Sequence, residues 1–521
     1  MFDLTSVAAV VETSPFLNFM VTNNLPVLSA ELMILVTALI VLALSLFNQP
    51  KQEQMTPTLT LLGLALSFMT LVLHGFVLFN GDPMATKLVL NGMIQGDLLS
   101  VMLRSLVVIG AFASALLAKT WAKQHLPTRL PELFSLLLIA TLGALLLCGS
   151  NDMVMTFVAL ETLGITAYLL VGLHKQSQAS TEASLKYLIY GGASSAIFLF
   201  GMALLYGFSG GHTSFPALFH GLGELKDFAW WQVLAFTCVL TGVGFKLSAA
   251  PFHIWSPDVY EASPTPMTLF LATVSKVAAL ALALRLLPSV VHSHVGLGAL
   301  IATLSVLSII VGNVLALRQT SLKRLLAYSS IAHIGYLLLG FVFASQATLG
   351  AVVFYLVGYV FMTIASFTSV SAMEATVGSD RIQQLPVFFK QQPVLGGLLA
   401  VVFIALAGLP LTAGFFGKVF LFQTLLQTGA QGVGLMMIAL LGSLVGVGYY
   451  LNVVYQLVKP TTLSNTEPSL SGTSNTAIAA HTEGILSVSV LVTLLLGIVG
   501  APLFTLCTSA VGVALATLYR F

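Results

Sequence analysis

The sequence predicts an all-α polytopic membrane protein, a single membrane domain over residues 1–521 with about fourteen transmembrane helices. Its residues are 57% hydrophobic and only 7% charged, whereas a soluble domain carries about 25% charged residues. Apolar runs of about 18 residues or more, long enough to cross a bilayer, recur from one end to the other. Two of these runs also contain a proline and a lysine, which are unfavourable in a lipid-buried helix.

The expected spans follow one another with short polar connections. Asp3 and Glu12 precede the first apolar run and no basic segment does, so we expect a retained helix there rather than a cleaved signal peptide. The stretch Thr461–His481 is rich in Ser, Thr and Asn, which indicates a flexible loop before the last span. The fourteen spans cover residues 25–46, 57–79, 97–118, 132–149, 152–173, 186–208, 232–255, 265–287, 297–317, 322–345, 348–373, 394–425, 433–457 and 484–515.

The basic residues support this layout and orient it. Of the twenty Lys and Arg residues, twelve fall in loops after odd-numbered spans, four in loops after even-numbered spans or at the C-terminus, and four inside spans. Because loops rich in Lys and Arg stay in the cytoplasm, we expect the odd-numbered loops there and both termini outside. The twelve are Lys51, Lys119, Lys123, Arg129, Lys175, Lys186, Arg318, Lys323, Arg324, Arg381, Lys390 and Lys459; the four on the other side are Lys87, Lys226, Arg285 and Arg520.

Spans seven and twelve are expected to be broken helices. Pro251 interrupts the run 232–255, and Pro410 interrupts the run 394–425. Proline removes a backbone hydrogen bond, and in a membrane the freed carbonyls are tolerated only where the backbone lines a cavity or packs on protein. The two runs lie five spans apart, so a five-helix repeat would place its second copy inverted. Broken helices at matching positions of inverted repeats indicate a transport site.

Four lone charges form the main candidate site: Glu161, Lys246, Lys276 and Lys418, each near the middle of an expected span. A charge at the bilayer centre costs roughly 2.5–3.5 kcal/mol on insertion scales, so we expect these side chains to face a protein interior or a water-filled path. Burial disfavours the charged form of a lysine and a nearby carboxylate favours it, so a lysine whose partner moves can load and release a proton. Arginine cannot, since it stays charged. The alternative is a static Glu–Lys pair that only fixes helix packing.

Two histidines, His253 and His333, lie within or beside spans seven and ten. Each could relay protons or act as a hydrogen-bonded packing residue. Span ten carries further polar side chains that could line the same water path, namely Tyr328, Ser329, Ser330 and Tyr336.

Other charges at the span ends allow a structural explanation. Glu31 in span one and Arg104 in span three are buried charges for which structural pairing is the alternative to a functional role. Asp258 and Glu261 follow span seven, where a fixed loop ion pair is favoured over a catalytic dyad.

No motif for a cofactor is present. The sequence contains no glycine-rich nucleotide loop after a strand, no CxxC pair and no helical histidine pair at metal spacing. Cys148, Cys238 and Cys507 lie far apart in apolar segments and match neither a disulfide framework nor a cluster spacing. We therefore expect no nucleotide, flavin, haem, metal or iron–sulfur cluster in this chain, so any redox energy that it uses must arrive from elsewhere.

Six stretches resemble the antiporter-like subunits of the proton-pumping NADH:quinone oxidoreductase (NDH-1, respiratory complex I) and of its cyanobacterial and plastid relatives, in particular subunit N (subunit 2). Over roughly residues 130 to 455 the similarity is close, and the pattern PFHxWxPDVYE is highly specific. The sister subunits L and M carry different residues after PD, and M typically has a glutamate where Lys418 stands. The stretches are ALETLGITAYLL, ASLKYLIYGGASSAIFLFGMALLYG, FKLSAAPFHIWSPDVYEASPTP, FLATVSKVA, TSLKRLLAYSSIAHIGYLL and GLPLTAGFFGKVFLF.

The resemblance implies a fourteen-helix subunit with two inverted five-helix repeats that contain the broken spans. The N-terminal helices would lie within residues 25–118, the first repeat within 132–287, the second within 297–457, and a C-terminal helix at 484–515. The membrane would be the bacterial inner (plasma) membrane, or the thylakoid membrane in a photosynthetic source.

The resemblance also implies a function. The subunit would couple electron transfer from NADH to quinone, in other subunits, to proton translocation through this chain. Glu161 would pair with Lys246 at the input channel, Lys276 would be the central relay, and Lys418 would lie on the exit side. NADH, FMN, the iron–sulfur clusters and quinone would be bound by partner subunits. The implied partners are subunit M, the small membrane subunits K, J and A, the lipid bilayer and, indirectly, the quinone pool, with no nucleic acid.

Three other functions remain open from the sequence. One is a cation/proton antiporter subunit that has no redox partner. Another is an antiporter-like subunit of a ferredoxin-driven NDH-1 or of a membrane-bound hydrogenase. A third is an inert scaffold, against which the lone lysines argue, because buried charges are unfavourable and packing alone does not need them. The electron donor, the quinone type and the use of Na⁺ in place of H⁺ depend on partners that this sequence does not contain.

Overall fold

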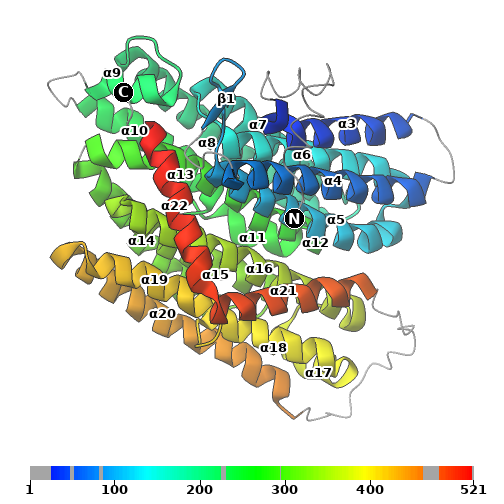
Figure 1. The fold of residues 1–521 in the computed structure, drawn as a ribbon. Coiled ribbons are helices and arrows are strands. Elements are labelled where there is room, and N and C mark those ends of the chain that lie inside the picture. Colours follow the sequence, from blue (N-terminus) through cyan, green and yellow to red (C-terminus); the bar gives the residue numbers. More distant parts are fainter. Residues whose placement is uncertain are drawn as a thin grey trace.

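The computed structural model describes residues 25–46, 52–80, 86–223, 230–293, 295–460 and 480–518, and it is almost entirely helical (Figure 1). Fourteen of its helices are long and apolar enough to cross a membrane, which confirms the predicted fold class. The helices are α3 (Ser29–Leu44), α4 (Gln52–Asn80), α5 (Leu98–His125), α6 (Leu130–Gly149), α7 (Met153–Val171), α8 (Gln178–Phe208), α9 (Phe215–Gly223), α10 (Trp230–Leu247), α11 (Trp255–Ala262), α12 (Thr265–Phe270), α13 (Lys276–Ser293), α14 (Val295–Ala316), α15 (Leu322–Phe343), α16 (Gln346–Val377), α17 (Leu385–Gln391), α18 (Pro393–Ala407), α19 (Ala413–Leu426), α20 (Gly429–Val458), α21 (Ala480–Ile498) and α22 (Gly500–Leu518).

The count of fourteen agrees with the prediction, but two runs differ from the expected spans. The run expected as span twelve consists of α18 and α19, which are short apolar helices separated around Pro410. The run 484–515 was predicted as one helix, and this is wrong: α21 ends at Ile498 and α22 begins at Gly500. Pro502, in the first turn of α22, cannot donate the backbone hydrogen bond that would continue α21. Figure 1 shows α22 running at a steep angle to α21, and α22 contacts α5, α13 and α16.

A small antiparallel hairpin precedes α5 and was not predicted. Its strands are β1 (Lys87–Val89) and β2 (Ile94–Gly96). The turn between them uses positive φ angles at Asn91 (55°) and Gly92 (84°), and Asn-Gly is a common sequence signal for such a turn. This signal was present in the sequence. The hairpin was missed because its strands have only three residues each and contain no apolar run.

The connecting loops gather on two opposite faces of the bundle. A polar cavity of about 700 Å³ brings together loops that follow odd-numbered spans, with His125, His174, Ser263, Lys323 and Asp380 in its walls. Loops that follow even-numbered spans meet elsewhere, through the bridges of residue 94 with residue 150 and of residue 152 with residue 214. This sorting is what alternate crossing of a membrane requires, so the structure supports the layout of the loops. Lys51, Lys226 and Arg520, and most of the predicted loop Thr461–His481, lie outside the described residues.

The orientation of the two faces can be tested by cysteine labelling. The charge distribution places His212, in the loop after α8, outside, and Gln178, at the start of α8, in the cytoplasm. We expect a membrane-impermeant maleimide to label His212→Cys in intact cells and Gln178→Cys only in inverted vesicles, with the native cysteines replaced by alanine. His212 is preferred to Gly210 or Gly211, whose positive φ angles would strain a new side chain. The reverse pattern would show that the orientation is wrong, and labelling of both from one side would show that the span count is wrong.

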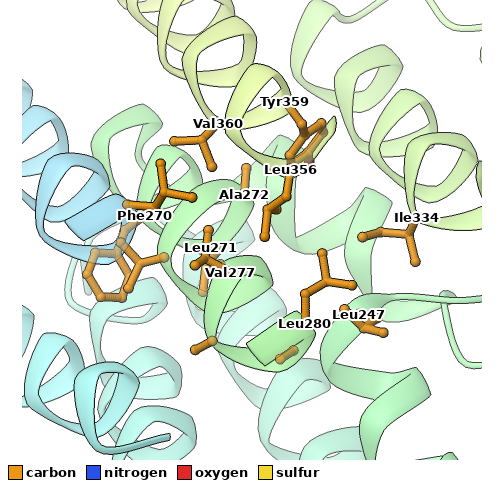
Figure 2. Packing of buried hydrophobic residues seen from close by; sticks show 14 of the residues in the cluster. Leu247, Phe270, Leu271, Ala272, Val277, Leu280, Ile334, Leu356, Tyr359 and Val360 are labelled. Carbon is orange, nitrogen blue, oxygen red and sulfur yellow. The ribbon is translucent and has the colours of Figure 1, made fainter. Parts of the chain in front are cut away.

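The most deeply buried part of the bundle is span eight, formed by α12, the π-helical segment Leu271–Ser275 and α13, together with α15 and α16. Figure 2 shows Leu271 and Val277 of span eight near Leu356 and Val360 of α16. All these side chains are buried in the largest apolar cluster of the structure. Span eight is thus surrounded by protein, and a charged side chain on it lies far from lipid.

Candidate functional site

The break in span seven exposes the end of a helix inside the bundle. Helix α10 ends at Leu247, and the next helix, α11, begins at Trp255. Backbone hydrogen bonds from Ser248 to the Phe245 carbonyl and from Ala249 to the Gly244 carbonyl close this helix end. Side chains hold the rest of the connection: the Ala250 N–H donates to Ser308 Oγ at 2.8 Å, and the Trp255 indole N–H donates to the Phe245 carbonyl at 3.2 Å. The predicted break around Pro251 is therefore confirmed, and it leaves C-terminal carbonyls of α10 available to other partners.

Lys246 lies in the last turn of α10 and is buried. Its Nζ has no hydrogen-bond partner among the described residues and lies 5.5 Å from the centroid of the Tyr168 ring on α7. Gly164 allows this approach, because a Cβ at that position would lie 2.9 Å from Lys246 Nζ. The ammonium group is thus packed against α7 without a fixed acceptor.

Glu161 lies on α7, about one helical turn before Gly164. Its charge acts on Lys246, yet no oxygen of Glu161 lies within 4.0 Å of Lys246 Nζ, and Oε1 is buried without a hydrogen-bond partner among the described residues. The structure therefore brings the predicted pair together but leaves it open. A closed, static salt bridge, the alternative interpretation, is not what the structure contains.

Lys276 is fully buried and connects span eight to the break. Its ammonium group donates a hydrogen bond to the Leu247 carbonyl at the open end of α10. A helix C-terminus carries partial negative charge, which favours a cation there. The π-helical segment Leu271–Ser275 comes directly before Lys276, and such segments are frequent at functional sites. Lys246 and Leu247 are neighbours in sequence, so Lys276 bonds the residue that directly follows Lys246 at the end of α10.

Lys418 is located in the same way at the second break. Its Nζ donates to the Ala407 carbonyl at the end of α18, at 3.3 Å, and to Ser443 Oγ on α20, at 2.8 Å. It also lies 5.3 Å from the centroid of the Tyr336 ring. The sequence placed Lys418 beyond the break, on α19, and its side chain leans back to the break because helical side chains point toward the N-terminus. Gly408 leaves room for it, since a Cβ there would lie 3.0 Å from Nζ.

His333 is the centre of a hydrogen-bonded network in the second half of the chain. Its Nδ1 is 2.8 Å from the Tyr355 hydroxyl, and its Nε2 is 3.1 Å from the Tyr450 hydroxyl, which in turn bonds Ser329. His333 also interacts electrostatically with Lys418. Polar side chains from α15, α16 and α20 thus meet at His333, near Lys418 of α19. A histidine with a tyrosine hydroxyl on each ring nitrogen can pass a proton from one side to the other.

Further polar groups extend the network toward Lys418. Asn313 Nδ2 donates to the Tyr336 hydroxyl at 3.0 Å, and the Tyr449 hydroxyl donates to Asn313 Oδ1 at 3.3 Å. The Tyr336 ring then contacts Lys418. Of the polar residues predicted on span ten, Ser329, Ser330 and Tyr336 make such bonds, while Tyr328 lies toward Arg324 instead. The residues that sequence reasoning missed are Tyr168, Asn313, Tyr355, Tyr359, Ser443, Tyr449 and Tyr450.

A signal for most of these missed residues was available. Tyrosine in membrane proteins is enriched at the lipid–water interface, yet Tyr355 and Tyr359 lie well inside α16, and they are buried. A tyrosine buried deep in a span needs a partner for its hydroxyl. Mid-span tyrosines can therefore be treated like mid-span charges when a polar path is sought.

His253 occupies a different place from the lysines. It lies in the break of span seven, is half-buried, and its Nδ1 has no hydrogen-bond partner among the described residues. Its neighbours Pro251 and Ile254 are exposed, so this part of the break faces the outer surface of the chain. No hydrogen bond joins His253 to Lys246 or Lys276 in the described part of the chain. A relay role for His253 stays a prediction.

An apolar layer separates Lys276 from the His333 network. Figure 2 shows Leu247 of α10 beside Leu280 of span eight, with Ile334 of α15 on the same side. Leu280 is one turn after Lys276, Ile334 directly follows His333, and all of these leucine and isoleucine side chains are buried. Within the described residues, no hydrogen bond links the two polar groups across this layer. The predicted site residues therefore fall into a Glu161–Lys276 group and a His333–Lys418 group.

Two ion pairs between buried side chains lie apart from the predicted site residues. Arg104 pairs with Glu31 at 2.9 Å, so structural pairing explains both residues. Arg285, counted in an outer loop from the sequence, is instead buried inside α13, where it pairs with Asp97 at 3.0 Å.

The two acidic residues after the first break form the loop ion pairs that the sequence favours. Arg324 Nη1 lies 2.9 Å from both Asp258 and Glu261, and Lys186 lies 3.1 Å from Asp258. These partly exposed bridges connect α11 with α8 and α15, and neither acid faces the buried lysines.

The fold and the site together define a polytopic membrane protein with lysines at the ends of two broken helices. Residues 150–446 match the family described as NADH:quinone oxidoreductase/Mrp antiporter, transmembrane. The chain is 38% identical to NAD(P)H-quinone oxidoreductase subunit 2 of Synechococcus elongatus over 492 residues, which is 94% of this chain and 92% of the relative. It is 38% identical to the protein of the same name from Thermosynechococcus vestitus, with 92% of each chain covered. The chain belongs to the NADH:quinone oxidoreductase/Mrp antiporter family.

Solved structures agree with this assignment. A chain of respiratory complex I from Thermus thermophilus with bound aureothin has a TM-score of 0.75 and 31% identity, covering 91% of this chain and 98% of that one. A chain of the Mrp complex from Dietzia sp. has a TM-score of 0.76 at 20% identity, covering 95% and 96%. The second likeness concerns the fold alone.

Proposed function

We infer that this chain is a proton-translocating membrane-arm subunit of an NAD(P)H:quinone oxidoreductase. The observation that carries this function is the open arrangement of the buried titratable groups. Lys246 has a charge partner without a closed bridge. Among the described residues, Lys276 bonds only a carbonyl at a helix end, and Lys418 bonds a helix-end carbonyl and the neutral Ser443 hydroxyl. A scaffold would gain nothing from such groups, because unpaired charges are unfavourable inside a membrane protein.

The geometry suggests an order of proton transfer. A proton taken up near Glu161 is held by Lys246 and then passes to Lys276, which bonds the next residue at the end of α10. Transfer to His333 crosses the apolar layer of Leu247, Leu280 and Ile334, and therefore requires water to enter there. His333 and its tyrosines then pass the proton toward Lys418. Because the apolar layer blocks the free passage of protons, redox energy from partner subunits can control when water enters the layer and lets a proton cross.

The particular subunit is inferred from Lys418 and the names of the relatives. Subunit M typically has a glutamate at this position, whereas this chain has a lysine, and the curated relatives are named subunit 2. We therefore place the chain as subunit N (subunit 2), next to subunit M and the small membrane subunits K, J and A. The redox groups are expected in other subunits. A ferredoxin-driven complex is the second candidate, and a donor comparison in isolated membranes separates the two.

Substitution of Lys276 tests the function. We expect Lys276→Met, which keeps the length of the side chain and removes its charge, to assemble and to lower donor-driven proton uptake into inverted vesicles about tenfold, the effect of about 1.4 kcal/mol on a barrier. The matched control is Lys186→Met, which removes a partly exposed lysine from a surface ion cluster and should cost less than about 1 kcal/mol of stability. Parental proton uptake by assembled Lys276→Met would refute the proposed function.

A further inference from the structure

An apolar groove lies on the flank of the bundle, away from the proton path. It has a volume of about 540 Å³ and runs between α4, α5, α16 and α21. Leu64, Phe68, Phe112, Phe361 and Val488 line it, and nearly all of its wall is apolar. Ligand sites have volumes of about 300–1,000 Å³, so the groove is large enough for a ligand.

The groove has the depth of one membrane leaflet. Along α21 it runs from His481 to Ser489, and along α5 from Leu116 back to Val108. Each of these stretches rises about 12 Å at 1.5 Å per residue, and half of the hydrocarbon core of a bilayer is about 15 Å. The groove begins on the loop face that carries most of the basic residues and ends near the middle of the helices. A single acyl chain of that leaflet matches this depth.

The mouth of the groove has basic side chains. Nε2 of His481 is buried without a hydrogen-bond partner among the described residues. A buried polar atom without a partner needs an explanation. Lys119 acts electrostatically on His481 and is half-buried beside it. Glu483, in the same turn as His481, is exposed, so Lys119 supplies the positive charge on the inner side of the mouth and the His481 ring supplies a hydrogen-bonding group.

We propose that this groove binds an anionic phospholipid, with one acyl chain between α4, α5, α16 and α21 and its phosphate against Lys119 and His481. The apolar wall matches the chain, the depth matches one leaflet, and the basic mouth matches the headgroup. A lysine near the cytoplasmic surface of a membrane attracts anionic lipids. The lipid fills the space between the N-terminal helices α4 and α5 and helices α16 and α21.

Photolabelling of the assembled complex in phospholipid vesicles tests the site. The probe is phosphatidylglycerol with a photoreactive group on one acyl chain, compared with the phosphatidylcholine analogue. We expect the phosphatidylglycerol probe to label peptides that contain residues 108–116 and 481–489. Gly484→Phe fills the groove, because Gly484 lines it and a Cβ there meets no atom within 4 Å. It should lower labelling about tenfold, which corresponds to about 1.4 kcal/mol of binding.

A matched control and a headgroup variant complete the experiment. Gly434 lies on the exposed surface of α20, and a Cβ there also meets no atom within 4 Å, so Gly434→Phe should not change labelling. Lys119→Gln with His481→Gln should abolish the preference for phosphatidylglycerol. Should Gly484→Phe fail to assemble, Val488→Phe serves as the second filler, since Val488 lines the groove and is exposed. Equal labelling in the filled variants, or crosslinks from the groove to a neighbouring protein, would overturn the proposal. Neither result depends on proton pumping.

Discussion

Lys418→Ala is expected to leave assembly nearly intact while proton uptake falls about tenfold or more. The side chain bonds only the Ala407 carbonyl and Ser443 Oγ, so its loss breaks no ion pair among the described residues. What disappears is the group at the second break that can hold and release a proton. The measurement is donor-driven proton uptake into inverted vesicles, together with the electron-transfer rate and a native gel that reports assembly.

Lys418→Arg separates charge from proton release. Arginine stays charged at all relevant pH values, so this variant should assemble and still pump poorly. The planar guanidinium must also fit beside Gly408, where space is short. Lys390→Ala is the matched control, because Lys390 is exposed in the last turn of α17 and lies outside the path. If assembled Lys418→Ala pumps at the parental rate, Lys418 is not the exit relay, and the parallel between the two broken helices fails.

Glu161→Gln is expected to have an effect of similar size on pumping, for a different reason. Glutamine keeps the size of the side chain and removes the charge that acts on Lys246. Without that carboxylate, holding a proton on the buried lysine becomes less favourable, so we expect proton uptake to fall about tenfold. Assembly should persist, because Glu161 makes no ion pair with Lys246 and its Oε1 makes no hydrogen bond among the described residues.

The control for this variant is Glu182→Gln, which removes an exposed carboxylate that pairs with Lys186 on the surface of α8. It should change neither assembly nor pumping, since exposed ion pairs contribute at most about 1 kcal/mol. Proton uptake at the parental rate by an assembled Glu161→Gln complex would show that the Glu161–Lys246 pair is only structural.

Much of this protein was determined by its sequence, because crossing a membrane is a local property. An apolar run of the right length crosses wherever it occurs, so the apolar runs could be located from hydropathy, although the run 484–515 proved to contain two helices. Pro251 and Pro410 marked the two breaks because proline removes a backbone hydrogen bond at its own position. Glu161, Lys246, Lys276 and Lys418 were conspicuous because a charge in a span is unfavourable whatever its neighbours are.

The tertiary structure alone decided what these groups contact. Lys276 reaches the carbonyl of Leu247, twenty-nine residues away, and the Tyr450 hydroxyl meets His333 across one hundred and seventeen. Such contacts depend on which helices pack side by side, and a helix that is apolar on all its faces gives little indication of which face meets a neighbour. The open Glu161–Lys246 pair and the apolar layer at Leu280 have the same origin. They follow from packing between helices, which no single span encodes.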